Sequence, residues 1–193
     1  MQELKFSSAT QKWYRPTSLH QLIKLQAEHQ SIKYVGGGTG NYKVHKLHND
    51  QGVALIDLTE VTELKFYTDE EYHWEFGAGL RLSEMQHIFD EMEVEKNPVA
   101  AAFKDVLSRL ASTQIRNTAT IGGALLWPHS CSDMMLLCSA LKCTLVIVSP
   151  DGSHNEINMD ETFFPSRILE IATKQSIIKS LRIKKLNTGK GRH

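Results

Sequence analysis

The segment LASTQIRNTATIGGALLWPHSCSDMMLL, residues 110–137, carries the most specific signal in this chain. Small and hydroxyl residues lead into the pair Gly122-Gly123, and a Ser132-Asp133 pair then precedes an apolar run. Glycine lacks a Cβ atom, so the backbone can approach a ligand closely, and neighbouring hydroxyls add hydrogen-bond donors. Asp133 has two interpretations, as the N-cap of the following helix or as an acceptor for hydroxyl groups of a ligand. The segment therefore predicts a close approach of backbone to ligand.

A second glycine-rich segment, YVGGGTGNY at residues 34–42, lies upstream. Consecutive backbone N–H groups without Cβ interference suit an anion such as a phosphate, and Thr39 adds a hydroxyl. The segment lacks the Lys-Ser/Thr pair of a Walker A loop, and Asn41 occupies the third glycine position of the Rossmann fingerprint. A tight turn between two strands is an equal alternative for this segment alone. Together, two such segments could grip one long ligand with phosphates in its middle, such as a dinucleotide.

Composition places the chain among ordinary globular proteins. It has 193 residues, of which 41% are hydrophobic, with 22 basic and 22 acidic side chains. This balance gives no argument for nucleic acid or membrane binding. The N-terminal stretch MQELKFSSATQKWYRP has no apolar core of a secretory signal, and the three cysteines fit no disulfide framework. We expect a reducing, cytoplasmic location.

Hydrophobic periodicity and turn residues predict an alternation of helices and strands. A helix, a strand, the glycine loop and a buried strand come first, and a hairpin, helices and a second hairpin follow. Ser83 is the expected cap of the helix that follows the first hairpin. The predicted elements are helices in residues 15–29, 81–93, 97–112 and 132–143, strands in 31–37, 52–59 and 176–183, hairpins in 63–80 and 144–159, and strand-like structure in 119–127.

Several separated motifs resemble one protein family in order and spacing. Residues 110–137 closely resemble the PCMH-type flavin-binding domain of the molybdenum hydroxylases, which include xanthine dehydrogenase, aldehyde oxidase and the medium subunit of carbon monoxide dehydrogenase. The upstream segments RPTSLHQLIKL, LIDLTEVTELK and FGAGLRLSEM resemble the same domain. The positions that match the family pattern in the first segment are Gln114, Ile115, Arg116, Asn117, Ala119, Thr120, Ile121, Gly122, Gly123, Ser132 and Asp133.

The resemblance implies a two-lobed α+β fold. A small N-terminal α/β lobe at residues 8–60 would carry the glycine-rich diphosphate loop, and residues 61–185 would form a larger α+β lobe. Residues 186–193 would be a disordered basic tail. The family's further C-terminal lobe has no counterpart here.

The resemblance also implies that the cofactor is FAD. Its diphosphate would lie on the backbone of residues 36–41, while Thr120 and the Gly122-Gly123 backbone would contact the diphosphate and ribityl region. Asp133 would bind cofactor hydroxyls, and no catalytic or metal residue is assigned. Arg116 has two open roles, attraction of the diphosphate or pairing with an acidic neighbour. The full set of predicted cofactor-binding residues is Lys33, Val35, Gly36, Gly37, Gly38, Thr39, Gly40, Asn41, Leu110, Ala111, Thr120, Gly122, Gly123, Ala124 and Asp133.

By the same resemblance, the chain would relay electrons from iron–sulfur and molybdenum centres through FAD to NAD⁺ or dioxygen. It would need partner subunits or domains that carry the iron–sulfur and molybdopterin groups. Two alternatives stay open at the level of sequence. The chain could be a nucleotide-binding or interaction module without turnover, or its glycine loops could hold a different diphosphate.

Overall fold

The computed structural model describes residues 12–40, 53–92, 97–126, 132–160, 171 and 174–186. The predictions made for Asn41 and for the tail after Leu186 lie outside these residues. Within the described ranges, no helix is both long enough and apolar enough to cross a bilayer.

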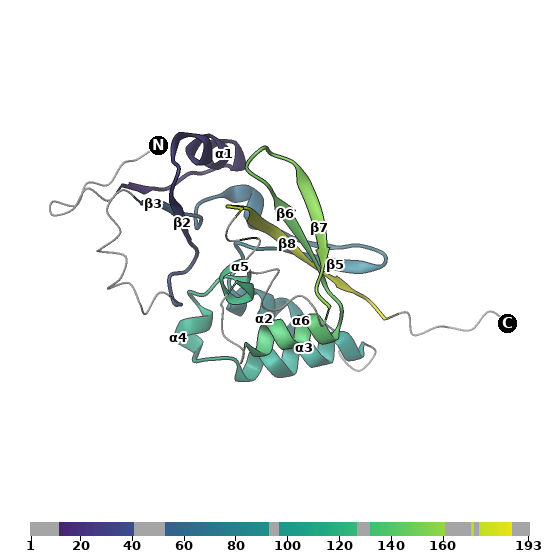
Figure 1. Cartoon of the computed structure of the whole chain (residues 1–193). Helices are drawn as coiled ribbons and strands as arrows, with labels where there is room; N and C mark the ends of the chain where they lie inside the picture. Colours follow the sequence, from purple (N-terminus) through teal and green to yellow (C-terminus); the bar gives the residue numbers. More distant parts are fainter. Residues whose placement is uncertain are drawn as a thin grey trace.

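A small parallel sheet and one helix form the N-terminal part of the fold (Figure 1). The sheet has the strand order β1-β3-β2, and every residue of its central strand β3 is buried, as the apolar run predicts. Ser18 caps the helix, because its side chain accepts a hydrogen bond from the N–H of Gln21. The elements are β1 (Trp13–Tyr14), α1 (Leu19–Glu28), β2 (Ile32–Val35) and β3 (Ala54–Asp57).

An antiparallel sheet of five strands forms the larger part, in the order β4-β5-β8-β6-β7. Its last strand in sequence, β8, lies at the centre, where it pairs with β5 on one side and with β6 on the other. Both predicted hairpins are present. The strands are β4 (Tyr67–Asp69), β5 (His73–Gly77), β6 (Thr144–Val148), β7 (His154–Asn158) and β8 (Ile177–Lys184), and a 3₁₀ turn, η2 (Thr62–Leu64), precedes β4.

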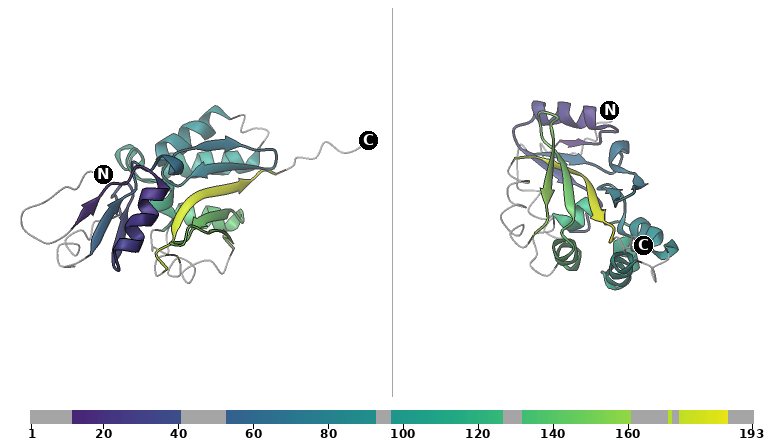
Figure 2. Two further views of the ribbon diagram at one scale, coloured as in Figure 1. Left: turned by 90° about the horizontal axis from the view of Figure 1, so that it is seen from above. Right: turned by 90° about the vertical axis from the view of Figure 1, so that its right-hand side faces the viewer.

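Three helices lie together on one side of this sheet, and the views of Figures 1 and 2 agree on this arrangement. Phe89 joins the helices to the sheet, because its ring centroid lies 5.3 Å from that of Phe76 and 5.1 Å from that of Phe103. All three phenylalanines are fully buried. The helices are α2 (Leu82–Glu91), α3 (Pro98–Arg109) and α6 (Asp133–Ala140), and two shorter ones, α4 (Thr113–Arg116) and α5 (Ile121–Leu125), lie between α3 and α6 in sequence.

The prediction of strand-like structure around the Gly122-Gly123 pair is wrong. Residues Ile121–Leu125 form the short helix α5, because Thr120 acts as an N-cap and accepts a hydrogen bond from the N–H of Gly123. The predicted cap Ser83 is also wrong. Arg81 is in extended conformation opposite Thr120, so α2 begins at Leu82. The short helix α4 was not predicted.

Two clusters of buried side chains underlie the two sheets. The larger cluster joins the five-stranded sheet to α2, α3 and α6. The smaller cluster belongs to the three-stranded sheet and α1, but it also contains Val61, Leu64 and Ile177 from the chain after residue 60. The two-lobed α+β class is confirmed, whereas the division of the chain at residue 60 stays a prediction.

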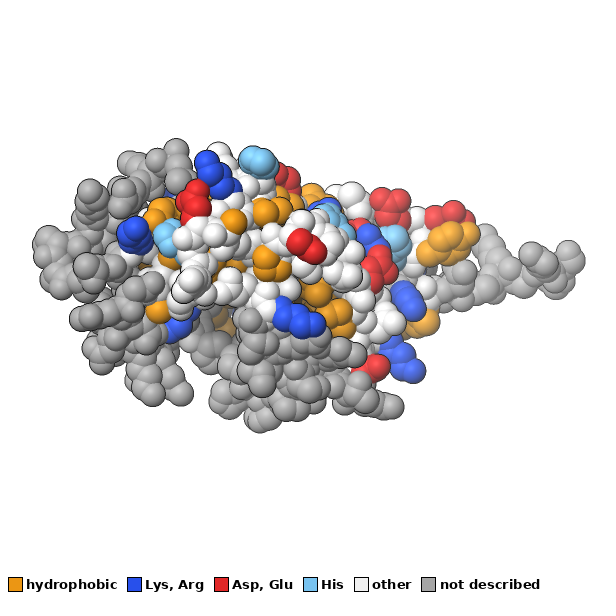
Figure 3. Space-filling model, turned by 45° about the horizontal axis from the view of Figure 1, so that its top comes forward, with side chains coloured by type: hydrophobic (Ala, Val, Ile, Leu, Met, Phe, Trp, Pro, Cys, Tyr) orange, Lys and Arg blue, Asp and Glu red, His pale blue; other side chains and the backbone are white. Residues whose placement is uncertain are grey.

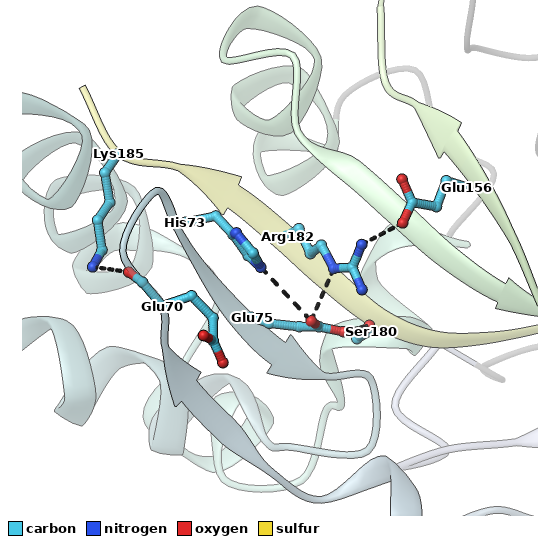
Figure 4. Close-up of polar contacts among 7 residues, drawn as sticks. All are labelled: Glu70, His73, Glu75, Glu156, Ser180, Arg182 and Lys185. Carbon is cyan, nitrogen blue, oxygen red and sulfur yellow. Dashed lines mark hydrogen bonds and ion pairs between the residues drawn. The ribbon is translucent and has the colours of Figure 1, made fainter. Parts of the chain in front are cut away.

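A polar network covers part of the five-stranded sheet (Figure 4). Glu75 on β5 accepts hydrogen bonds from the Ser180 hydroxyl and, at 2.8 Å, from Nε of Arg182, both on β8. Arg182 also pairs with Glu156 on β7. On the face seen in Figure 3, acidic and basic side chains of the described residues are interspersed. Positive and negative side chains therefore lie close to one another over that face.

Candidate functional site

The two glycine-rich segments meet in space. A Cβ atom placed on Gly37 would lie 1.7 Å from the carbonyl oxygen of Thr118, and one placed on Gly36 would lie 2.5 Å from Oγ1 of Thr120. Real Cβ contacts do not occur at these distances, so only glycine fits at either position. Residues 36–40 and 118–123 therefore form one continuous structure, which we call the glycine cradle.

A pocket of about 890 Å³ opens beside the glycine cradle. Its volume lies near the upper end of the range of roughly 300–1,000 Å³ that is typical of cofactor and ligand sites. Of the predicted cofactor residues, Lys33 and Val35 do not line it, and Asn41 lies outside the described residues. The predicted residues that do line it are Gly36, Gly37, Gly38, Thr39, Gly40, Leu110, Ala111, Thr120, Gly122, Gly123, Ala124 and Asp133.

The first half of the cradle presents backbone N–H groups. Among the described residues, the N–H groups from Gly36 to Gly40 donate no hydrogen bond. Gly38 has φ +71°, a left-handed conformation that glycine adopts without strain. Successive N–H groups in such a loop make a concave donor surface for an anion.

The second half of the cradle, residues 118–123, is hydrogen-bonded to the turn after β5. The N–H of Gly122 donates to the carbonyl of Ala78 at 2.9 Å, and the N–H of Ile121 donates to that of Leu80 at 2.9 Å. A Cβ on Gly122 would lie 3.1 Å from the Ala78 Cβ, so the contact is tight. The start of α5 is therefore fixed against the five-stranded sheet.

The corner between α3 and α4 forms the apolar wall with Leu110, Ala111 and Ile115. The Arg116 guanidinium donates from Nη1 to the carbonyl oxygens of Leu110 at 3.0 Å and Ala111 at 2.8 Å. Its Nη2 lies 3.3 Å from Oγ1 of Thr113. Among the described residues, Arg116 therefore binds backbone carbonyls of its own chain and pairs with no acidic side chain. The expected attraction of the diphosphate stays a prediction.

Asp133 stands at the start of α6, and its neighbour Ser132 is the helix cap. The Ser132 hydroxyl accepts a hydrogen bond from the N–H of Met135 at 3.4 Å. The Asp133 side chain has no hydrogen bond to any described residue and lines the pocket. Of the two interpretations of Asp133, the cap is excluded. Its carboxylate is available to accept hydrogen bonds from a ligand.

Several pocket residues were missed at the sequence level, among them Ser176, Ile177 and Ile178 at the start of β8. Ser176 is only 4% exposed, and its hydroxyl has no hydrogen bond to any described residue. These residues form part of a plain apolar strand, and no motif marks them. Their position at the pocket depends on β8 being central in the sheet.

Tyr34 lines the pocket and forms hydrogen bonds at the junction of the two sheets. Its hydroxyl accepts a hydrogen bond from Nε2 of Gln26 at 2.6 Å and donates one to the carbonyl of Gln175 at 3.1 Å. Gln26 Nε2 also donates to Gln175 O at 2.8 Å. Burial raises the pKa of Tyr34 to about 12, although the Gln26 hydrogen bond opposes the shift. The phenol therefore stays protonated at neutral pH.

The fold thus combines two sheets with a pocket beside a cradle whose N–H groups from Gly36 to Gly40 donate no hydrogen bond within the described residues. The family model described as the FAD binding domain in molybdopterin dehydrogenase matches residues 4–184. The chain therefore belongs to this family of FAD-binding domains, and the predicted cofactor FAD is confirmed as the family's cofactor.

Curated relatives include oxidoreductases of much greater length. The chain is 32% identical to the xanthine dehydrogenase of Drosophila pseudoobscura pseudoobscura over 170 residues, which cover 84% of this chain and 13% of that protein. It is 27% identical to aldehyde oxidase 2 of Macaca fascicularis over 184 residues, 93% of this chain and 14% of the relative. The chain thus spans about one seventh of the length of these relatives.

Solved structures show the same fold at low identity. A chain of carbon monoxide dehydrogenase from Hydrogenophaga pseudoflava matches with a TM-score of 0.76 and 20% identity, covering 98% of this chain and 62% of that one. A chain of quinoline 2-oxidoreductase from Pseudomonas putida 86 matches with a TM-score of 0.75 and 19% identity, covering 94% and 60%. These matches confirm the predicted fold class.

Proposed function

We propose that the pocket holds FAD with its diphosphate on the glycine cradle. The observation that carries this proposal is the contact between Gly37 and Thr118, because it brings two glycine-rich segments to one pocket. The N–H groups of residues 36–40, which donate to no described residue, would donate to the diphosphate oxygens. Backbone donors of this kind stabilise an anion through hydrogen bonds and need no lysine, which agrees with the absence of a Walker lysine in the sequence.

The remaining wall residues suit the other parts of the cofactor. Leu110, Ala111 and Ile115 offer an apolar surface to a flat ring. The carboxylate of Asp133, which has no hydrogen bond to any described residue, would accept hydrogen bonds from ribityl or ribose hydroxyls. Ala124 offers no polar group, so this position adds shape and no hydrogen bond. The site would fix orientation through a few polar contacts in a largely apolar pocket.

The reaction that follows from this proposal is electron transfer. Bound flavin supplies the redox chemistry, and the residues of this chain bind and orient it and limit its exposure to water. We infer that the chain relays electrons from partner subunits or domains with iron–sulfur and molybdopterin groups to NAD⁺ or dioxygen. The named relatives are oxidoreductases, which supports the reaction class. Cys138 and Cys143 are buried free thiols, which favours a reducing compartment such as the cytoplasm.

Titration of the purified chain with FAD tests the binding step. Quenching of flavin fluorescence that saturates at one equivalent is expected, with a Kd below tens of micromolar. NAD⁺ and ADP are the matched controls, because each offers a diphosphate without the flavin. No FAD binding at tens of micromolar, or equal affinity for all three, would remove the proposal.

The electron acceptor is a separate question with its own experiment. The FAD-loaded chain is reduced with dithionite under anaerobic conditions and mixed in a stopped-flow instrument with NAD⁺ or with air-saturated buffer. Recovery of the oxidised flavin spectrum identifies the acceptor. A flavin that neither acceptor reoxidises would favour a binding module without turnover.

A further inference from the structure

We propose that Arg116 is a positioning residue that holds Ala111 in a left-handed backbone conformation and so shapes the apolar wall of the pocket. The effect on FAD affinity rests on the function proposed above. The effect on the backbone is a property of the chain without ligand, and it is measured independently.

The turn after α3 contains a backbone conformation that is unfavourable for its residue. Ala111 has φ +54°, in the left-handed region where the Cβ atom crowds the following carbonyl. Glycine or asparagine is the usual residue at such a helix end. An alanine keeps this conformation only where surrounding contacts enforce it.

Arg116 supplies these contacts. Its Nη1 bridges the carbonyl oxygens of Leu110 and Ala111, at 3.0 Å and 2.8 Å, and its Nη2 reaches Oγ1 of Thr113. The carbonyls at the end of a helix lack partners within the helix, and a cation there also interacts favourably with the helix dipole. The planar guanidinium presents its N–H donors in a rigid fork that spans two carbonyls and a hydroxyl, whereas the ammonium of lysine is a compact point charge on a flexible stem.

The turn is linked directly to the pocket, since Leu110, Ala111 and Ile115 all line it. Ser112 caps α4 by accepting a hydrogen bond from the N–H of Ile115 at 3.3 Å. The direction in which α4 leaves the turn therefore depends on the conformation at Ala111. Loss of the Arg116 contacts would let Ala111 relax to negative φ and move Ile115 relative to the cradle.

The first test uses the chain without FAD. A residue with positive φ gives a strong NOE between its own amide and Hα protons, so Ala111 is expected to show one in the wild-type chain. In Arg116→Gln this NOE should weaken to the level of a negative-φ residue, and in Arg116→Lys it should weaken as well. A strong NOE that persists in Arg116→Gln would overturn the proposal.

The second test is a double-mutant cycle on FAD affinity. Arg116→Gln is expected to weaken binding about tenfold. Ala111→Gly alone is the reference, since it removes the methyl group that Ala111 contributes to the pocket wall. The double variant should bind FAD within about threefold of this reference, because glycine adopts the left-handed turn without support. Additive loss in the double variant would contradict positioning. Full affinity in Arg116→Lys would indicate instead that Arg116 acts through its charge on the diphosphate.

The two tests separate the possible failures. If the wild-type chain binds no FAD, the proposed function fails while the NOE still decides the role of Arg116. If Arg116→Gln does not fold, addition of Ala111→Gly should restore folding, measured by circular dichroism. Failure of this rescue would also contradict the proposal.

Discussion

The carbonyl oxygen of Thr118 lies 1.7 Å from the point where a Cβ atom on Gly37 would stand. The two residues belong to different motifs, and each motif alone is compatible with an ordinary turn. Their contact removes that ambiguity, because it places both motifs at one pocket. The glycine at position 37 is thus required by the chain itself as well as by any ligand.

Substitution of Gly37 therefore tests the cradle. Gly37→Ala must push the two segments apart, and we expect a loss of about 3 kcal/mol in the free energy of unfolding together with loss of FAD binding. Gly38→Ala is the matched control, since its Cβ would meet only Val35 Cγ1 at 3.8 Å. The control should cost about 1 kcal/mol for its positive φ. Urea unfolding measures both, and equal effects would contradict the close contact.

A second variant pair tests the contact between Gly36 and Thr120. A Cβ on Gly36 would clash with Oγ1 of Thr120 at 2.5 Å but would lie 3.6 Å from its Cβ, an ordinary contact. Thr120→Ala should cost about 1 kcal/mol through loss of the cap. Combined with Gly36→Ala, the two losses should be less than additive by about 1 kcal/mol. Thr120→Ser keeps the hydroxyl and should give no such relief. Full additivity in the alanine pair would argue against the contact.

Removal of the Tyr34 hydroxyl should loosen the junction between the two sheets. Tyr34→Phe loses the hydrogen bonds to Gln26 and Gln175, while the direct bond between those two residues remains, so a cost of about 1 kcal/mol is expected. Burial raises the pKa of Tyr34 to about 12, above its usual value near 10. The contribution of the Tyr34 hydroxyl to the free energy of unfolding is therefore complete below pH 10 and is lost as pH rises toward 12.

The Phe variant lacks this group and should show a flatter decline in melting temperature above pH 10 than the wild type. Thermal unfolding of both proteins over pH 7 to 11 measures the difference. Parallel curves in this range would show that the Tyr34 hydroxyl is not buried as the structure places it.

The polar network on the five-stranded sheet predicts that the stability of the fold depends on pH in the acid range. Burial would raise the pKa of Glu75, but hydrogen bonds from Ser180 and Arg182 outweigh it, and the net pKa is lowered. A lowered folded-state pKa contributes stability above the unfolded value of about 4.3 and loses it as pH falls through the folded value. The melting-temperature advantage of wild type over Glu75→Gln should be greatest near pH 7 and should shrink below about pH 4. An advantage that is constant down to pH 3 would contradict the charge network.

The sequence was sufficient for the four longer helices, the two hairpins and the two-lobed α+β class, because hydrophobic periodicity and turn residues are local signals. It failed at Ile121–Leu125, where an apolar run around two glycines suggested a strand. The cap by Thr120 and the hydrogen bonds of Ile121 and Gly122 to the turn after β5 make it a helix, and the second of these is a tertiary effect.

The pocket-lining residues could be predicted from the sequence where they belong to the glycine-rich motifs, and they could not be predicted elsewhere. Lys33 was among the predicted cofactor residues but does not line the pocket, whereas Ser176 does. Ser176 reaches the pocket only because β8 returns to the centre of the sheet. The hydrogen bonds from Arg116 to backbone carbonyls were not predicted, because every residue has a carbonyl and no sequence pattern marks the ones that a side chain will bind.

The most direct test of a shared FAD site is an NMR titration of the ¹⁵N-labelled chain with FAD. The amide signals of Gly37, Gly38 and Gly40 and those of Gly122 and Gly123 should shift together and stop changing at one equivalent of FAD. A shift in the signals of only one glycine segment, or of neither, would contradict the proposal that the two segments form a single FAD cradle.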